Sequence, residues 1–238
     1  MMEFGELVGP DTRAFWGNYD EFDEENGQLE PNNFSWKWMD EDSSGAENIV
    51  SFKNLFIVEG QGIFDFVQTT ILKKISPLCQ IDGHKTSVYR LSNGDYICVS
   101  EDNDLDQSAK MAELLVPWLK RAEQTYVFPF KSAYTYNTQQ EFDKRCFIRT
   151  ISNNNTTTEN ENEFASMEDC NIVYGLSAGV STWRHINKLP FTCYTIYMDC
   201  QQVDPFVASV ALKLFHRLGL DCDASYVLKT VNKSNLYL

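Results

Sequence analysis

The sequence predicts an α/β domain built on a largely parallel sheet, and three local patterns predict it. The run 54–60, NLFIVEG, is short, apolar and ends in glycine, which indicates a buried strand. Apolar residues then recur at helical spacing in 62–75, GIFDFVQTTILKKI, and a strand followed by a helix favours parallel pairing. Finally, 86–100, TSVYRLSNGDYICVS, places Asn93-Gly94 between two β-rich runs, where positive φ angles fit a tight hairpin turn.

The middle of the chain continues the alternation of helix and strand. A helix is predicted from Asp106 to about residue 122, with a kink or an end near Pro117, because proline removes a backbone hydrogen bond. The run 125–130, TYVFPF, is a strand candidate. The run 145–151, RCFIRTI, fits either a strand or a helical turn, and its period does not distinguish the two.

The last third of the chain carries the clearest helix. We predict a strand at 171–174 and a helix over 175–188. Another strand is predicted at 190–199. The segment 204–219 then has Asp204 as N-cap, Pro205 in the first turn, in-register apolar residues and Gly219 as the stop signal. A short final helix is predicted at 224–231.

The charge is concentrated at the N-terminus. Of the net charge of -14, residues 1–48 contribute 13 acidic and 2 basic side chains, or -11, which leaves -3 for the other 190 residues. Such an acidic segment buries too little apolar surface to offset its ordering entropy, so residues 1–47 are predicted to be disordered. Its scattered aromatic residues suit either a partner-binding arm or a solubilising tail.

The remaining organisation is a single domain over 48–231, followed by a short tail at 232–238. The polar, low-complexity stretch 153–169 is expected to be a flexible surface insertion. No basic patch exists to neutralise nucleic-acid phosphates, and no apolar run is long enough to cross a bilayer. Neither nucleic acid nor a membrane is therefore expected as a partner.

The cysteines and the N-terminus indicate a reducing compartment. The seven cysteines form no CxxC pair and no Cys/His spacing suited to zinc, so they are expected to be reduced core thiols, with no metal or cofactor site. The N-terminus lacks the basic-then-apolar order of a signal peptide. The expected location is the cytoplasm or the nucleus.

One motif suggests catalysis. Gly175 to Gly179, GLSAG, matches the G-x-S-x-G pattern between a strand-like run and a helix, and Asp199 or Asp204 and then His216 follow Ser177 in the chain order of α/β hydrolases. Against this alternative, His216 lies inside a regular amphipathic helix, only 39 residues separate it from Ser177, and no Gly-rich oxyanion loop precedes the motif. The favoured interpretation is a close-packed helix start and no catalytic residue.

Three weaker candidates are also more consistent with structural roles. His84 lies in a predicted turn and His185 in a predicted helix, and neither has a neighbouring ligand set. The stretch 59–62, EGQG, follows a strand but lacks the full phosphate-loop pattern, so only the helix N-terminus beyond it could hold an anion.

Four pieces of the sequence carry a resemblance to a known family. In order, they are FGELV near the N-terminus, NLFIVEGQGIFDFVQTTI, NIVYGLSAGVSTWRHINKLPFTCYTIYMD and the terminal SNLYL. Together they resemble the proteasome assembly chaperone 1 family in order and spacing. That family ends in a hydrophobic-tyrosine-any residue motif, which falls here on Leu236, Tyr237 and Leu238.

The resemblance implies a non-enzymatic chaperone. It implies a heterodimer with proteasome assembly chaperone 2, which promotes assembly of the α-ring of the 20S proteasome and docks in a pocket between α-subunits through Leu236, Tyr237 and Leu238. It also implies a three-layer α/β/α sandwich, similar to phosphorylase/hydrolase-like enzymes but without their active site.

Overall fold

A mixed sheet forms the centre of the domain. The computed structural model describes residues 34–39, 49–101, 105–138, 145–153, 164–200 and 202–223, all within one unit of the chain, 34–238. In these residues, eight strands pair in the order β1-β3-β4-β5-β2-β6-β8-β7. The strands are β1 (Trp36–Trp38), β2 (Phe52–Glu59), β3 (Cys79–Ile81), β4 (Thr86–Arg90), β5 (Tyr96–Ser100), β6 (Ala122–Ser132), β7 (Cys146–Ser152) and β8 (Phe191–Met198). The central strands β5, β2, β6 and β8 are parallel, and the outer strands pair antiparallel.

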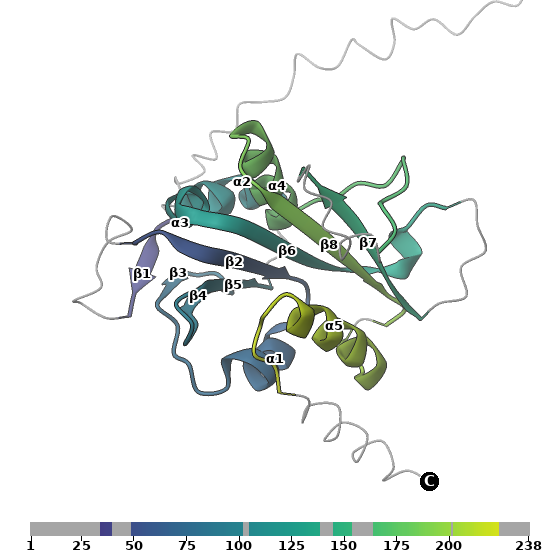
Figure 1. Ribbon diagram of the computed structural model, residues 1–238, viewed down its shortest axis with the longest axis horizontal. Helices are drawn as coiled ribbons and strands as arrows, with labels where there is room; N and C mark the ends of the chain where they lie inside the picture. The colour runs from purple at the N-terminus through teal and green to yellow at the C-terminus, as the bar shows by residue number, and fades with distance from the viewer. Residues whose placement is uncertain are drawn as a thin grey trace, which may run out of the picture. The chain divides into compact units, whose positions relative to one another are not determined.

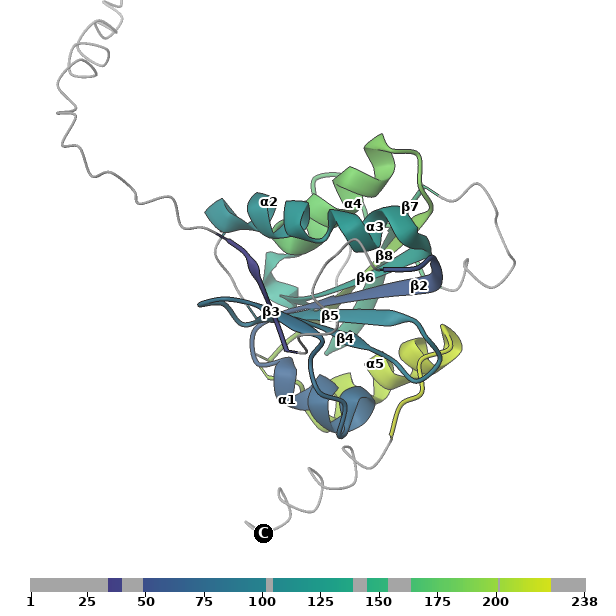
Figure 2. The same cartoon turned by 90° about the vertical axis from the view of Figure 1, so that its left-hand side faces the viewer.

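Helices cover both faces of the sheet, which confirms the expected three-layer α/β/α sandwich (Figures 1 and 2). One face carries α2 (Leu105–Leu114), α3 (Val116–Arg121) and α4 (Leu176–Ile186). The other carries α1 (Phe64–Val67), its π-helical continuation η4 (Gln68–Leu72), and α5 (Pro205–Arg217). A short 3-10 turn, η5 (Ala133–Thr135), follows β6. No helix in the described ranges combines the length and the hydrophobicity that a membrane span requires.

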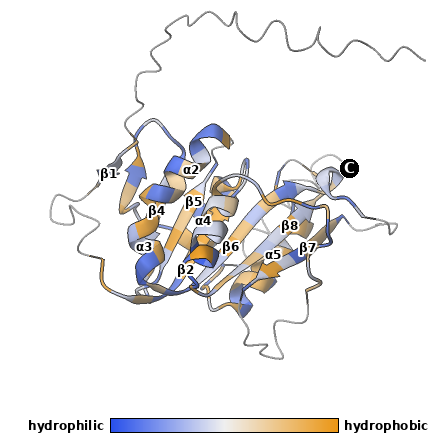
Figure 3. Cartoon of the chain, turned by 90° about the horizontal axis from the view of Figure 1, so that it is seen from above, coloured by the Kyte–Doolittle hydropathy of each residue, from blue (hydrophilic) through white to orange (hydrophobic). Residues whose placement is uncertain are grey.

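Strand β2 shows how the two cores are built. Its side chains alternate between faces, so Leu55 and Ile57 join the core under α2, α3 and α4, while Phe56 and Val58 join the core over α1 and α5. All four are fully buried, and each contributes roughly 1.5–3 kcal/mol of transfer free energy. In Figure 3, β2 and β5 are coloured mainly as hydrophobic, whereas α2 and α3 mix hydrophilic and hydrophobic residues.

The predicted turn and cap signals are confirmed. The β4–β5 hairpin closes with a hydrogen bond from Leu91 N to Asp95 O, and Gly94 has a φ of 88°. At the start of α5, the carboxylate of Asp204 accepts from Val207 N at 2.8 Å, and Gly219 follows the helix with a φ of 84°. Local chemistry therefore determines both features.

One predicted strand is absent from the structure, and two other predictions are decided by it. Residues 171–174 form no strand, and Ile172 is 78% exposed, because this segment lies outside the sheet. The ambiguous run 145–151 is the edge strand β7. The predicted kink or end near Pro117 is confirmed, because Pro117 lies in the first turn of α3 and the helix is divided into α2 and α3. The final helix predicted at 224–231 lies outside the described residues.

Part of the acidic N-terminal segment joins the sheet. Residues 36–38 form β1, within the segment 1–47 that was predicted to be disordered. The rings of Trp36 and Trp38 lie 5.3 Å and 6.0 Å from that of the buried Trp118, and Trp36 Nε1 donates to Leu114 O at 3.0 Å. Aromatic packing thus anchors this stretch. Residues 1–33 and 40–48 lie outside the described part of the chain.

Candidate functional site

The carboxyl ends of the parallel strands meet at one edge of the sheet, the usual ligand-binding position in open α/β folds. Glu59 ends β2, Lys131 lies near the end of β6, and Asp199 directly follows β8. Helices α2, α4 and α5 all begin at this edge. This edge is therefore the candidate functional site.

Glu59 occupies the N-terminus of α4. Its Oε1 accepts a hydrogen bond from Leu176 N at 3.1 Å and its Oε2 accepts one from Ser177 N at 2.8 Å. The first N–H groups of a helix have no intrahelical partner and attract anions. Since the side chain of Glu59 is only 4% exposed, this carboxylate takes the position that an anionic ligand would need.

Lys131 lies beside this carboxylate. Its Nζ is 4.0 Å from Glu59 Oε1 and 3.7 Å from the centroid of the Tyr174 ring. Burial lowers the pKa of Lys131, whereas the charge of Glu59 acts in the opposite direction. The pair leaves little net charge at the base of the site.

Above this pair lies a pocket of about 550 Å³. Its walls combine apolar and polar side chains: Glu59, Gln61, Leu105, Phe130, Lys131, Ser132, Tyr134, Tyr174, Met198, Asp199 and Cys200. At its margin Arg145 donates to Asp199 Oδ2 from Nε at 3.2 Å and to Asp204 Oδ2 from Nη2 at 2.9 Å. These carboxylates raise the pKa of Arg145.

The structure does not bring together the residues of the hydrolase alternative. Ser177 is fully buried, and its Oγ has no hydrogen-bond partner among the described residues. Helix α4, which carries Ser177, packs on one face of the sheet, whereas His216 is an exposed residue of α5 on the opposite face. The acidic candidates Asp199 and Asp204 bind Arg145 instead. This geometry gives the serine hydrolase no support.

The second candidate anion site is also occupied by a protein carboxylate. After the EGQG stretch, Phe64 N donates to Glu101 Oε1 at 2.7 Å, and α1 has only four residues. His84 stacks on Phe34 with ring centroids 4.7 Å apart, and His185 is exposed on α4. In the described ranges, no three His, Cys, Asp or Glu side chains converge as metal ligands.

Glu59, Lys131 and Tyr174 were not identified as a group from the sequence. The only sequence signal was a charged residue at or near the end of an apolar strand, once in β2 and once in β6. Such a residue is unexpected in a buried strand unless it has a partner. The partners are distant in sequence, so the signal did not reveal them.

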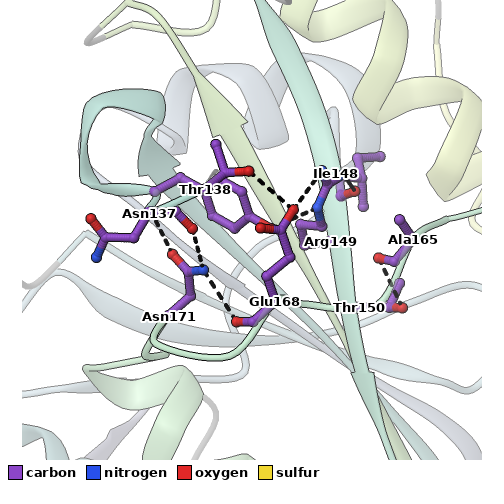
Figure 4. Close-up of polar contacts among 9 residues, drawn as sticks. Asn137, Thr138, Ile148, Arg149, Thr150, Ala165, Glu168 and Asn171 are labelled. Carbon is purple, nitrogen blue, oxygen red and sulfur yellow. Dashed lines mark hydrogen bonds and ion pairs between the residues drawn. The ribbon is translucent and has the colours of Figure 1, made fainter. Parts of the chain in front are cut away.

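A polar cluster covers the edge strand β7 (Figure 4). Arg149 donates from Nε to Tyr136 Oη at 2.8 Å, and its Nη2 lies 3.8 Å from Glu168 Oε1. Thr138 donates to the same Glu168 oxygen at 3.2 Å. Asn171 then links the two flanking segments through the backbone of Asn137.

The backbone of β7 is paired on its outer side as well. Thr150 N donates to Ala165 O at 3.0 Å, and Met167 N donates to Thr150 O at 2.9 Å. Residues from 164 onward, the end of the predicted insertion 153–169, therefore pack against β7; residues 154–163 lie outside the described part. This covering protects the edge from pairing with another strand.

The cysteines are free thiols that differ sharply in their surroundings. Burial raises the pKa to about 12 for Cys79, Cys146, Cys193 and Cys222, and Cys98 is also buried. Cys200 is half-buried with a raised pKa, and Cys170 is exposed. Thiolate is the reactive form, so the buried thiols should be inert near neutral pH.

We expect Cys170 to react first with a thiol reagent such as DTNB at pH 8. A thiol of pKa about 12 is ionised in only about one molecule in 10⁴ at that pH. The Cys170→Ser variant should lose the fast phase of the reaction. In denaturant, all seven thiols of the wild-type protein should react. A fast phase of unchanged amplitude in that variant would contradict the assignment.

Leu236, Tyr237 and Leu238, the predicted partner-binding residues, lie outside the described residues. Their role remains a prediction from the sequence.

Comparison of the sequence with protein-family models and with curated proteins gave no match. Solved structures, in contrast, include clear structural neighbours. Pyrococcus furiosus PbaB, an archaeal proteasome activator, has a TM-score of 0.61 at 8% identity, covering 85% of this chain and 96% of that one. Pyrococcus furiosus PbaA, an archaeal homologue of proteasome-assembly chaperone, has a TM-score of 0.56 at 14% identity, covering 78% and 91%. A Thermoplasma acidophilum protein of unknown function has a TM-score of 0.58 at 10% identity, covering 79% and 86%. The chain therefore shares the fold of these archaeal proteins.

Proposed function

We propose that this chain is a non-enzymatic proteasome assembly chaperone. It acts as a heterodimer with proteasome assembly chaperone 2 and promotes assembly of the 20S proteasome α-ring. The observation that carries the proposal is the presence in one chain of a fold shared with PbaA and a terminal Leu236-Tyr237-Leu238. The cytoplasm and the nucleus are the compartments in which it would act.

The geometry of the carboxyl edge supports a binding role over catalysis. The N-termini of α4 and α1 are each occupied by a carboxylate of the chain itself, Glu59 at α4 and Glu101 at α1. The serine of the G-x-S-x-G motif is buried. At α4, the carboxylate of Glu59 offsets the positive end of the helix dipole, which stabilises the fold. The same N–H groups are then not available to stabilise a developing oxyanion.

The tail would supply the specific contact with the ring. Burial of Leu236 and Tyr237 in an inter-subunit pocket would contribute roughly 2 kcal/mol each. The terminal carboxylate of Leu238 would form a charge-assisted hydrogen bond with a lysine of the pocket. Because the tail is joined to a folded domain that makes other contacts, it acts at high effective concentration.

Deletion of Leu236 to Leu238 should weaken binding to α-subunits by about 10- to 100-fold, since part of the burial energy is spent on ordering the tail. Binding to proteasome assembly chaperone 2 should stay intact. The measurement is quantitative co-purification of the two partners with the tagged full-length chain.

A second variant tests whether the free carboxylate of Leu238 contributes to binding, or whether the tail packs on its own domain. Adding one glycine after Leu238 leaves every side chain in place but moves the charge, so it should also weaken α-subunit binding. Undiminished α-subunit binding by both variants would refute the role of the tail.

A further inference from the structure

A groove with apolar walls lies beside the end of α5. Its volume is about 580 Å³, and three segments form it: the end of η4 with the residues after it, the β4–β5 turn and the chain after α5. We call it the α5-end groove. The apolar residues that line it are Ile71, Leu72, Ile75, Leu91 and Leu220.

The α5-end groove combines an apolar surface with a polar rim. Leu72 is fully buried, whereas Ile75 and Leu91 are only half-buried where they pack against the core over α1 and α5. Lys73 and Lys74 are exposed at the rim. An apolar groove framed by charged side chains suits a helix that is apolar on one face and polar on the other.

The described part of the chain ends beside this groove. Leu220 and Asp221 belong to the groove wall, and Asp223 N donates to Thr70 O of η4 at 2.8 Å. In Figures 1 and 2, the yellow segment after α5 runs beside the blue segment that holds α1 and η4. Residues 224–238 therefore begin three residues after the groove wall, on the same face of the sheet.

The sequence that follows has the pattern of a helix with one apolar face. Asp223 is a favourable N-cap residue, and Lys229 falls in the last turn on the opposite, polar face. A helix of eight residues is too short to be stable alone in water, so it requires packing of its apolar face. The apolar residues recur at i, i+3, i+4 and i+7: Ala224, Val227, Leu228 and Val231.

We propose that residues 224–231 form a helix that packs its apolar face into the α5-end groove, against Ile75 and Leu91. The groove supplies the packing that so short a helix needs, and the helix covers the half-buried walls of the groove. The occupant is a segment of this chain, because the chain enters the groove wall directly before the segment begins. This inference goes beyond the proposed function and does not depend on it.

A docked helix limits the reach of the chain end. The seven residues 232–238, fully extended, span about 23–25 Å, whereas fifteen extended residues after Asp223 would span about 50–54 Å. Docking thus halves the distance over which the last residues can make a contact, and it fixes the point from which they start.

The test is a matched pair of substitutions in the full-length chain, Leu228→Gln and Lys229→Gln. Glutamine is a good helix former, so neither change removes the helix by propensity, but only the first places an amide in the apolar contact. In the wild type, the amides of residues 228–231 should exchange with solvent at least tenfold more slowly than in an unstructured peptide, after correction for intrinsic rates. Leu228→Gln should lose at least tenfold of this protection, and Lys229→Gln should keep it within about twofold.

Methyl NMR then locates the contact. The methyl resonances of Ile75 and Leu91 should shift in Leu228→Gln and stay in place in Lys229→Gln. Val50 is the internal control, because it is 78% exposed just before β2, away from the groove. Its methyl resonances, and those of the buried Ile57, should be the same in all three proteins, which also shows that the domain is folded.

Three results would overturn the inference. Free exchange of residues 228–231 in the wild type would leave the groove open to another molecule. Equal loss of protection in the two variants would show that no particular face of the helix is docked. Unchanged Ile75 and Leu91 resonances in Leu228→Gln would place the helix elsewhere; if deletion of Leu236 to Leu238 shifted those resonances instead, the occupant would be the chain end.

Discussion

Replacing Arg184 with methionine should lower the free energy of unfolding by about 3–5 kcal/mol, the cost of removing one side of a buried charged network. Arg184 is fully buried in α4. Its guanidinium donates to Leu119 O at 2.7 Å, Ala122 O at 2.9 Å and Glu123 O at 3.0 Å, and its Nε donates to Pro190 O at 3.1 Å. These bonds tie α4 to the end of α3, the start of β6 and the loop before β8.

The expected loss of stability arises because methionine cannot donate hydrogen bonds to the backbone carbonyls that Arg184 satisfies. The carbonyls at the end of α3 carry the negative end of the helix dipole and have no intrahelical partner. Each carbonyl that stays buried without a donor costs about 1–3 kcal/mol. Burial lowers the pKa of Arg184 to about 10, so the side chain is still charged at neutral pH.

Unfolding in urea measures the effect. Arg90→Met is the matched control, because Arg90 is an exposed residue at the end of β4 and its loss should change stability by no more than about 0.5 kcal/mol. A loss of less than about 1 kcal/mol for Arg184→Met would show that the network is not needed.

Replacing Gly175 with alanine should cost about 2–4 kcal/mol of stability, the second largest effect. Gly175 precedes α4 with a φ of 83° and a ψ of -158°, a conformation that is essentially restricted to glycine and costs a residue with a side chain about 1–3 kcal/mol. An added Cβ would also collide with the carboxylate of Glu59, whose Cδ would lie 3.1 Å away. Glu59 would be displaced from Leu176 N and Ser177 N, and those buried donors would lose their acceptor.

Gly219→Ala is the comparison for a positive φ without a steric clash. Gly219 has a nearly equal φ of 84°, but an added Cβ there meets nothing within 4 Å. Its substitution should cost only about 1–2 kcal/mol. In a Glu59→Ala background, where the Cβ no longer meets the carboxylate, Gly175→Ala should cost less than it does in the wild-type background. Equal costs of the two glycine substitutions in the wild-type background would contradict the role of Glu59 as the helix cap.

The sequence by itself determined the features that depend on neighbouring residues. Asn93-Gly94 specified the β4–β5 hairpin, because Gly94 supplies the positive φ that the turn requires and the side chain of Asn93 accepts from Asp95 N; the positive φ expected at Asn93 as well is absent. Asp204 and Gly219 marked the ends of α5 because capping acts within one turn of the helix. The continuous apolar run in β2 indicated a strand buried on both faces, and with it the α/β class.

Only the tertiary structure decided what the candidate site contains. Glu59 and Ser177 are 118 residues apart, yet the Glu59 carboxylate accepts from Ser177 N and occupies the start of α4, within the GLSAG motif. In the same way, residues 171–174 have the composition of a strand but lie outside the sheet, while Trp36 and Trp38 come from an acidic segment and pack on Trp118. In each case, the structure of the segment depends on which distant group pairs with its buried donors or covers its apolar surface. Local sequence patterns do not contain that information, because burial and pairing energies arise between segments that meet only in the folded chain.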